Sequence, residues 1–438
     1  MRVAVYGLWH LGPVTAACLA SAGHSVVAID ESAPVVDGLS RGVCPVFEPG
    51  LSELVLACLA AGNLRFTSNL ASGLAHCDIL WVTYDTPVDD NDVADVEFVI
   101  GQTEKALRHA AQNCLVVVSS QLPVGSISQL EAIAQKLDRP DLAFVCSPEN
   151  LRLGKAIQVF SKPDRIVAGV RREADALRFK QLMAPISSDV LVMRVESAEM
   201  TKHAINSFLA TSVSFANEIA AICEVSGADA NEVARGLKSD SRIGPGAYLG
   251  PGGPFAGGTL ARDIGFLSDR ARQTGVELSV IPAVAVSNDR HRGWALARLH
   301  ALLGELDGLP IAILGLTYKP GTDTLRRSSA IELARALKAA GADVSAYDPM
   351  VAALPPDIDF DLVLAASAAE AVVDAAAVVI GTDWPGLKTL DWHTMIGHMA
   401  RPVVIDANGF LAAVLESEAG VTYASVGRVI DRSRSPTP

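Results

Sequence analysis

Residues 2–12 read "RVAVYGLWHLG", an apolar run that leads into Gly7 and Gly12. The run predicts a buried strand that ends at Gly7. The next residues, "PVTAACLASAG" (13–23), predict a helix closed by its final glycine. "HSVVAID" (24–30) then predicts a second strand that ends at Asp30. The chain therefore begins with a strand–helix–strand unit of about thirty residues, which is typical of a parallel α/β sheet.

The loop between the first strand and the helix resembles a dinucleotide fingerprint with one departure. In G-x-G-x-x-G the glycines allow a tight turn, a close approach of backbone to pyrophosphate, and close helix packing. Here the second glycine position is Trp9, so we expect its indole to point away from the phosphates. Asp30 is placed to bond a ribose 2′-hydroxyl, which favours NAD over NADP. Glycines also occupy such turns for structural reasons, so the loop alone leaves both interpretations open.

The composition of the chain argues against nucleic-acid-binding, membrane-spanning and secreted proteins. The net charge of −13 over 438 residues argues against a nucleic-acid or membrane surface. No secretory signal is visible after Met1, and charges break every apolar stretch before the ~18 residues of a membrane span. Seven cysteines occur without a C-x-x-C pair, which indicates a reduced, cytoplasmic protein with no metal site.

The rest of the chain repeats the strand–helix alternation twice, around a helical centre. Residues 196–225 contain no Gly or Pro and carry an apolar stripe at helical spacing, which predicts one long helix and a homodimer through it. The alternation restarts at "LPIAILGLTY" (309–318). We therefore predict an α/β fold with two Rossmann-like, doubly wound parallel-sheet domains joined by a long central helix. The predicted regions are a dinucleotide-binding domain (1–193), a helical dimerisation region (194–300), a second Rossmann-like domain (301–430) and a disordered tail (431–438).

Several blocks in order identify a family resemblance. They are "FEPGL" (47–51), "PVGS" (123–126), "SPENLRLGKAI" (147–157), "PDRIVAG" (163–169), "AEMTKHAINSFLATSVSFANEIA" (198–220), "DSRIG" (240–244) and "GLTYKPGTDTLR" (315–326). With these blocks the chain resembles the UDP-glucose/GDP-mannose dehydrogenase family along nearly its whole length. The resemblance implies an NAD domain, a dimerising helix and a nucleotide-sugar domain. Such enzymes oxidise a sugar C6 alcohol to a carboxylate with two NAD, through an aldehyde and a cysteine thioester.

The sequence departs from that family where the cysteine acts. The block G-F-G-G-S-C-x-P-K-D reads "PFAGGTLARD" (254–263), which places Thr259 at the cysteine and Arg262 at the lysine. A thiol attacks an aldehyde readily, whereas a threonine hydroxyl needs a strong, positioned base. Gln121 stands where the family has a threonine, and Leu153 replaces a glutamate. All of these differences concern the second, hydrolytic half of the reaction.

The residues that match the first oxidation are present. Lys202 and Asn206 are four residues apart and so share one face of the long helix. By resemblance they stabilise charge at the reacting oxygen together with Asp263 and hold a water; a solvated lysine and a packing asparagine are the structural alternative. The catalytic residues implied are Lys202, Asn206, Asp263, Glu149 and Thr259.

The resemblance also implies binding residues for cofactor and substrate. Cofactor contacts fall on Gly7, Leu11, Gly12, Asp30, Thr86 and Arg326. Substrate contacts fall on Leu151, Arg242, Tyr248, Phe255, Gly257 and Lys319, with Arg242 reaching a neighbouring subunit's substrate. The glycine-rich segment 243–258 is either a backbone cradle for a diphosphate or a flexible lid.

Three hypotheses follow from these residues. In the first, an NAD-dependent nucleotide-sugar dehydrogenase, with a UDP-sugar favoured over a GDP-sugar, stops at an aldehyde or acts as an epimerase. In the second, the enzyme still forms an acid with another nucleophile, for which Cys146 is the candidate. In the third, the chain is an inactive paralogue that binds a nucleotide sugar. The number of NADH molecules formed per sugar separates the three.

Overall fold

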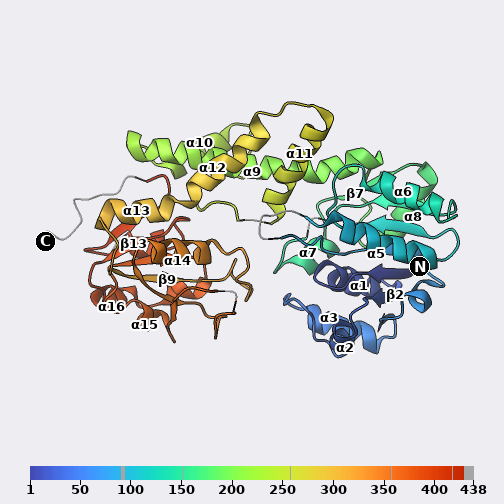
Figure 1. The fold of residues 1–438 in the computed structure, drawn as a ribbon, viewed down its shortest axis with the longest axis horizontal. Coiled ribbons are helices and arrows are strands. Elements are labelled where there is room, and N and C mark those ends of the chain that lie inside the picture. The colour runs from blue at the N-terminus through green and yellow to red at the C-terminus, as the bar shows by residue number, and fades with distance from the viewer. Residues whose placement is uncertain (90–93, 150, 257, 357, 417, 429–438) are drawn as a thin grey trace. The chain divides into compact units, whose positions relative to one another are not determined.

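The computed structural model describes residues 1–89, 94–149, 151–256, 258–356, 358–416 and 418–428. The predicted tail, 431–438, lies outside the described residues. The chain divides into two compact units, Met1–Ile205 and Asn206–Pro438 (Figure 1).

The first unit contains, among its described residues, an eight-stranded sheet in the order β3-β2-β1-β4-β5-β6-β7-β8. Its strands are β1 (Arg2–Tyr6), β2 (Ser25–Ile29), β3 (Leu64–Thr67), β4 (Ile79–Val82), β5 (Leu115–Val118), β6 (Ala143–Cys146), β7 (Ile166–Val170) and β8 (Val190–Met193). Its helices are α1 (Leu11–Ser21), α2 (Ala33–Ser40), α3 (Leu51–Ala60), α4 (Leu70–Leu74), α5 (Val96–His109), α6 (Ser126–Lys136), α7 (Ala156–Ser161) and α8 (Glu173–Met183). The order in which the strands lie is that of a doubly wound sheet.

One pairing differs from the predicted parallel sheet. β7 runs antiparallel to β6, with Val145 opposite Val170 and Cys146 opposite Gly169. The described part of the connection, residues 147–165, contains the short helix α7 and no long helix of the kind that usually links parallel strands. The chain therefore turns back from the carboxyl end of β6, and β7 and β8 run against the other six strands.

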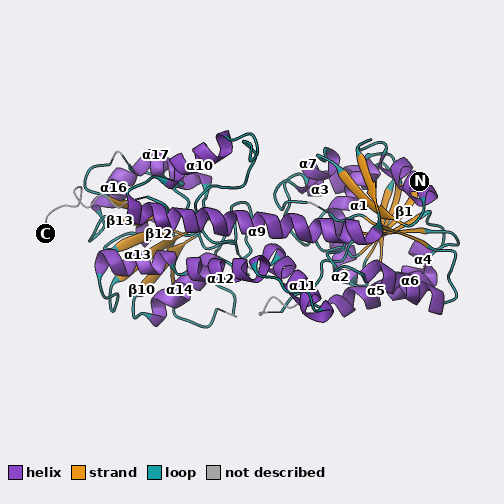
Figure 2. Cartoon of the chain, turned by 90° about the horizontal axis from the view of Figure 1, so that it is seen from above, coloured by secondary structure: helices purple, strands orange, loops and turns teal. Residues whose placement is uncertain are grey.

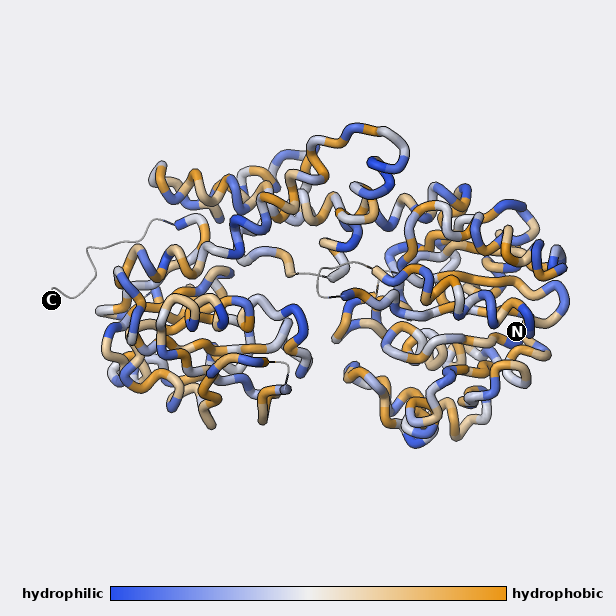
Figure 3. The backbone as a smooth tube through the Cα atoms, in the orientation of Figure 1, coloured by the Kyte–Doolittle hydropathy of each residue, from blue (hydrophilic) through white to orange (hydrophobic). Residues whose placement is uncertain are grey.

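Both faces of this sheet are covered, and the strand sequences show why. Along β1, Val3 and Val5 belong to one apolar cluster and Ala4 and Tyr6 to another. Successive side chains of a strand point to opposite faces, so a strand buried on both sides is apolar throughout. Figure 3 shows orange, hydrophobic segments running through the middle of this unit.

The second unit repeats this design. Its described strands form a parallel six-stranded sheet in the order β11-β10-β9-β12-β13-β14. They are β9 (Pro310–Leu314), β10 (Asp343–Tyr347), β11 (Val363–Leu364), β12 (Ala377–Ile380), β13 (Val403–Ile405) and β14 (Thr422–Ala424). The helices are α10 (Ala230–Ser239), α11 (Thr259–Thr274), α12 (Val280–Arg292), α13 (Trp294–Leu303), α14 (Ser329–Ala339), α15 (Ala368–Ala371), α16 (Trp392–Gly397) and α17 (Ala412–Leu415), with a 3₁₀ turn η1 (Pro385–Thr389).

The predicted long helix is present as α9 (Val195–Ser226), which is unbroken over 32 residues (Figure 2). Among the described helices, it alone is long and apolar enough to cross a membrane by length and composition, with a mean hydropathy of 1.3 and 39% of that window buried. Its charge-free run from residue 203 to 217 is shorter than the ~20 residues of a span. Lys202, Asn206 and Asn217 are buried polar side chains on it, as in a helix packed inside a protein.

Both sheets begin with the same turn. Gly7 has a φ of +99° and Gly315 a φ of +93°, so each turn needs a residue without a side chain. The carboxylate of Asp30 accepts the N–H of Leu8 at 2.8 Å, and that of Asp348 accepts the N–H of Leu316 at 2.7 Å. An aspartate at the end of the second strand therefore fixes the loop after the first strand in each unit.

Gly12 packs the first helix against this turn, and its replacement tests the fold. A Cβ at Gly12 would lie 1.9 Å from the carbonyl oxygen of Gly7, which is backbone and cannot rotate away. We expect Gly12→Ala to lower the free energy of unfolding by about 3 kcal/mol, the upper end for overpacking. Urea unfolding followed by circular dichroism measures the change.

Gly101 on α5 is the matched control, because a Cβ there meets no atom within 4 Å. Gly101→Ala should stabilise the helix by up to about 1 kcal/mol. Equal effects of the two substitutions would contradict the proposed close packing at Gly12.

Candidate active site

Three of the expected cofactor residues lie after the carboxyl ends of strands in the first unit. Gly7 follows β1, Asp30 follows β2 and Thr86 follows β4, where the Thr86 hydroxyl donates to the Gln121 carbonyl at 2.6 Å. A Cβ at Gly7 would lie 2.7 Å from the Tyr84 ring, so the turn packs closely against Tyr84 and has no room for a side chain there. Leu11 begins α1, and Trp9 is 57% exposed. These groups fit a dinucleotide, and the orientation of Trp9 toward it stays a prediction.

Asp30 keeps room for a ribose. Its two oxygens accept the N–H groups of Leu8 and Ser32, at 2.8 and 2.9 Å, and the residue is half-buried. A carboxylate has about four acceptor positions, so two remain for hydroxyl groups.

Glu149 and Lys202 meet in the first unit. Glu149 follows β6, and the Lys202 ammonium on α9 donates to its carbonyl oxygen at 2.6 Å and lies 3.6 Å from its carboxylate. Lys202 is 8% exposed, which excludes the alternative of a solvated helix lysine. A buried ammonium beside a carbonyl and a carboxylate is positioned to stabilise negative charge on a bound oxygen.

Cys146 lines the same small cavity as Gln121, Glu149 and Lys202. It is the last residue of β6 and is buried. Burial, and to a lesser extent the Glu199 carboxylate, raise the pKa of its thiol well above the ordinary value. The thiolate that nucleophilic attack requires is therefore disfavoured.

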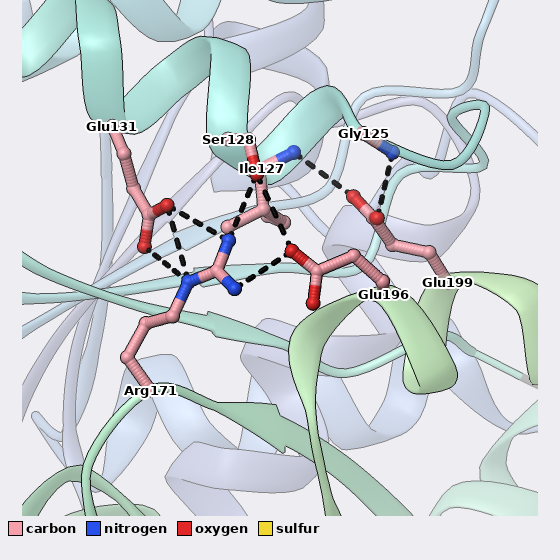
Figure 4. A network of polar contacts seen from close by, with 7 residues as sticks. All are labelled: Gly125, Ile127, Ser128, Glu131, Arg171, Glu196 and Glu199. Atoms are coloured by element: carbon pink, nitrogen blue, oxygen red, sulfur yellow. Dashed lines mark hydrogen bonds and ion pairs between the residues drawn. The ribbon is translucent and has the colours of Figure 1, made fainter.

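Two residues that sequence reasoning missed flank Lys202 on α9 and bond to the segment that leads into α6. The buried carboxylate of Glu199 accepts the N–H groups of Gly125 and Ile127, at 2.8 and 2.9 Å, at the start of α6 (Figure 4). Burial raises the pKa of Glu199, and these two N–H groups oppose the shift. The ring of His203 bonds to the Leu122 carbonyl at 3.0 Å. The signal in the sequence was a glutamate and a histidine flanking the lysine on an apolar helix.

A second cluster in Figure 4 fastens the beginning of α9. The Arg171 guanidinium bonds to Glu131 on α6 at 3.0 Å and to Glu196 on α9 at 2.7 Å. Its side chain also donates to the Ser128 hydroxyl. One arginine thus connects β7 with two helices beside the Glu199 contacts.

In the second unit the structure brings Asn206 and Asp263 together. Both are buried, and the Asn206 amide donates to the Asp263 carboxylate at 2.5 Å. Thr259, at the position of the family's cysteine, is the first residue of α11 and is exposed. Thr259 and Asp263 are four residues apart and share one face of that helix.

The glycine-rich segment before α11 is anchored by side chains. The N–H groups of Gly252, Gly253 and Phe255 donate to Asn217, Asn408 and Asn288 respectively, at 2.8–3.0 Å. The ring of His291 bonds to the Gly252 carbonyl at 2.7 Å. These three N–H groups are therefore taken, so the expected diphosphate cradle does not include them, and this part of the segment is no free lid.

A cavity of about 590 Å³ lies beside this segment. Three expected substrate residues line it: Tyr248, Phe255 and Lys319. Sequence reasoning missed His291, Trp294 and Asn408, which line it too. Aromatic walls with one lysine suit a nucleotide, because rings stack on a base and an ammonium attracts phosphate.

The structure leaves other expected residues outside this cavity. Arg242 pairs with Asp240 at 2.7 Å, and its side chain is 87% exposed. Leu151 packs against an apolar cluster of the first unit, and Arg326 is an exposed residue of the second. Gly257 lies outside the described residues. The role of Arg242 at a neighbouring subunit stays a prediction.

Comparisons with known proteins cover almost the whole chain. Family models of the UDP-glucose/GDP-mannose dehydrogenase family match it in three parts: the NAD binding domain at residues 1–187, the central domain at 196–290 and the UDP binding domain at 312–413. The chain belongs to the UDP-glucose/GDP-mannose dehydrogenase family. A UDP-glucose 6-dehydrogenase of Pseudomonas aeruginosa is 34% identical over 98% of both chains.

Further relatives agree with this assignment. The UDP-glucose 6-dehydrogenase TuaD of Bacillus subtilis is 33% identical over 100% of this chain and 95% of its own. A solved UDP-glucose dehydrogenase from Pyrobaculum islandicum is 30% identical, with a TM-score of 0.83 over 92% of this chain and 93% of that one. The family is one of NAD-dependent nucleotide-sugar dehydrogenases, so this chain is an enzyme of that kind with NAD as its cofactor.

Asp383 offers a test of how the cavity wall is held. Its carboxylate accepts the Asn408 amide at 2.9 Å. Burial, followed by the nearby Asp406 carboxylate, raises the pKa of Asp383 to about 6. A raised carboxyl pKa means that the folded state prefers the proton, so ionisation destabilises it as the pH rises from about 4 to 6. We expect Asp383→Asn to stabilise the protein by about 1–2 kcal/mol at pH 8, after allowance for partial exposure, and by much less at pH 4.5.

Urea unfolding at the two pH values measures the difference. Asp391 is the control, since hydrogen bonds from the Thr394 N–H and hydroxyl lower the pKa of its exposed carboxyl. Asp391→Asn should therefore be destabilising at pH 8, opposite in sign to Asp383→Asn. If Asp383→Asn raised the free energy of unfolding equally at both pH values, the charge of the Asp383 carboxylate would not be the source of the destabilisation.

Proposed function

We propose that this enzyme oxidises the primary C6 alcohol of a UDP-sugar by two electrons and releases the aldehyde. The observation that carries the proposal is Thr259, an exposed hydroxyl where the family's nucleophile stands, on the same helix as the buried Asp263. Retention of Lys202, Asn206 and Asp263 supports the first oxidation. Replacement of the cysteine removes the group on which the second oxidation depends.

The proposed oxidation requires only a few side chains of the protein. NAD, when bound, accepts the hydride from C6. Lys202 donates toward the oxygen that loses its proton, and its charge is worth most there because the site is buried. Asn206 lies one turn further along α9, and its amide is oriented by the Asp263 carboxylate, so its carbonyl oxygen stays free to accept from a water or the hydroxyl. The alcohol thus gives up one hydride to NAD and one proton to that water, and the product is an aldehyde.

Acid formation with Cys146 is the second candidate. The specific observation in its favour is that Cys146 lines the cavity of Glu149 and Lys202. The raised pKa of its thiol argues against it, as does Gln121 in place of a threonine. We therefore assign Cys146 a packing role.

The remaining site assignments are also proposals. We place NAD at Gly7, Leu11, Gly12, Asp30, Thr86 and Arg326, and the substrate at Leu151, Arg242, Tyr248, Phe255, Gly257 and Lys319.

The match to a UDP binding domain supports a UDP-sugar over a GDP-sugar. The first sheet ends at Met193, which supports the division at 193/194, whereas 300/301 falls inside α13, whose Leu299 packs into the core of the second sheet. Seven cysteines without a disulfide support a cytoplasmic enzyme.

A homodimer through α9 is supported by its outer face. Phe208, Phe215 and Ile222 recur every seven residues and are 69%, 44% and 60% exposed. Val225 extends the row and is 85% exposed. Such an apolar stripe on one helix is the kind of surface that a second copy covers.

Product stoichiometry tests the proposed reaction. With a UDP-sugar as substrate we expect one NADH per sugar and an aldehyde that a hydrazine reagent traps. Lys202→Ala should reduce turnover by about a hundredfold, since a charge contact present mainly in the transition state contributes about 3 kcal/mol. Thr259→Ala should leave turnover within about threefold, because the proposal gives this hydroxyl no bond to make.

Other results would decide for the alternatives. Two NADH and a sugar acid, abolished by Thr259→Ala, would make the threonine a nucleophile. The same products abolished by Cys146→Ser would favour acid formation through that thiol. No NADH from any nucleotide sugar, with binding retained, would indicate an inactive paralogue.

Light scattering tests the dimer. The chain has a mass of 45.9 kDa, so a dimer should scatter as about twice that value. Phe208→Asp combined with Ile222→Asp should shift the protein to the monomer mass, because two charges would be buried at the interface. The matched control is Val286→Asp, an exposed residue of α12, which should leave the mass unchanged. A wild-type mass near 46 kDa would exclude the dimer.

A further inference from the structure

A buried carboxylate connects two loops of the first unit that are distant in sequence. Glu48 lies between α2 and α3, and its side chain is 1% exposed. It accepts the N–H groups of Gly154 and Ala156, each at 2.8 Å. Its third partner is the ring Nε2 of His10, at 3.1 Å.

One of these loops belongs to the proposed NAD site, and the other follows the candidate catalytic residue Glu149. His10 belongs to the turn between Gly7 and Gly12 and directly precedes α1. Gly154 and Ala156 end the segment that begins with Glu149, the partner of Lys202. The single carboxylate of Glu48 is therefore hydrogen-bonded both to the turn between Gly7 and Gly12 and to the segment that follows Glu149.

The chemistry of the contact fixes its direction. An ionised carboxylate only accepts hydrogen bonds, so Nε2 of His10 must carry the proton and donate. A buried carboxylate is costly unless its oxygens are fully bonded. Oε2 has two donors, Gly154 and His10, so loss of the histidine leaves it with one. We therefore expect the Glu48 carboxylate to move when His10 is lost, and the two loops that it bonds to move with it.

We propose that Glu48 and His10 are positioning residues that couple NAD binding to the order of residues 151–156. The inference rests on the proposed placement of NAD at residues 7–12. When the cofactor orders the turn, His10 holds Glu48 in place, and Glu48 holds the N–H groups of Gly154 and Ala156. Residues 151–156 are thereby more ordered with cofactor bound than without it.

Two substitutions at one position test the coupling. His10→Phe keeps a ring but removes the donor, whereas His10→Gln restores an N–H donor of similar reach. Hydrogen exchange of the cofactor-free protein reports the order of residues 152–157, and calorimetry reports NAD affinity. We expect His10→Phe to speed exchange of the Gly154 and Ala156 amides about tenfold and to weaken NAD binding about tenfold, the size of one hydrogen bond to a charged group. His10→Gln should restore most of both.

Glu48→Gln gives a second line of evidence. An amide cannot accept from three donors without turning its NH₂ group toward one of them, so it should change exchange and affinity at least as much as His10→Phe. His393 is the matched control, because its ring lies 3.3 Å from Glu418 in the second unit but is 88% exposed. His393→Phe should change neither quantity.

Each other outcome overturns the proposal. Weaker NAD binding in His10→Phe with unchanged exchange at 152–157 would mean that His10 contacts the cofactor alone. Faster exchange with unchanged affinity would mean a structural clamp without coupling. A failure of His10→Gln to restore either quantity would mean that the ring, not the donor, matters. None of these readouts depends on whether the product is an aldehyde or an acid.

Discussion

Each sheet depends on one hydrogen bond between a carboxylate and a backbone N–H. Asp30 and Asp348 end the second strand of their sheets and accept from the residue after the first strand's glycine. The bond fixes how the first loop leaves the sheet, which sets where the following helix begins. The other loops of the site leave from the same edge, since the carboxyl ends of parallel strands lie together.

The two copies of this contact differ in how much of the carboxylate they use. Asp348 is 3% exposed and also accepts from the Trp384 indole and the Thr317 hydroxyl. Asp30 has only backbone partners among the bonds described and remains half-open. One unit thus retains acceptor positions for a ribose, while the other has closed them with its own side chains. The difference agrees with the match of the first unit to an NAD binding domain and of the second to a UDP binding domain.

The sequence predicted those features that depend on local patterns. Gly7, Gly12 and Asp30 follow from a strand–turn–helix rule, and the long α9 follows from thirty residues without Gly or Pro. The antiparallel β7 escaped prediction because strand direction depends on what lies between strands. β8 also escaped it, since its exposed residues Leu191 and Val192 mark no buried strand.

Residues of the site were predictable from the sequence only where they lie in one of the motifs that resemble the family. Lys202, Asn206 and Asp263 lie in blocks that resemble a family, and the structure shows each of them buried. Glu48 and His10 meet across 38 residues, and Asn288 and Phe255 across 33, so no local pattern could pair them. Side chains that anchor loops from distant helices are selected by tertiary geometry, which leaves little trace in one sequence.

The anchoring of the glycine-rich segment also bears on the chemical lifetime of the protein. Asn408 is followed by Gly409, and asparagine before glycine is prone to lose its amide because the next backbone nitrogen attacks the side chain. Here the Gly409 N–H is bonded to the Asp406 carbonyl at 3.0 Å, and both ends of the Asn408 amide are held, by Gly253 and Asp383. The attacking nitrogen and its target are therefore kept from the geometry of ring closure. Deamidation would place a further carboxylate beside Asp383 and Asp406, so the contacts that shape the cavity wall also protect it from chemical ageing.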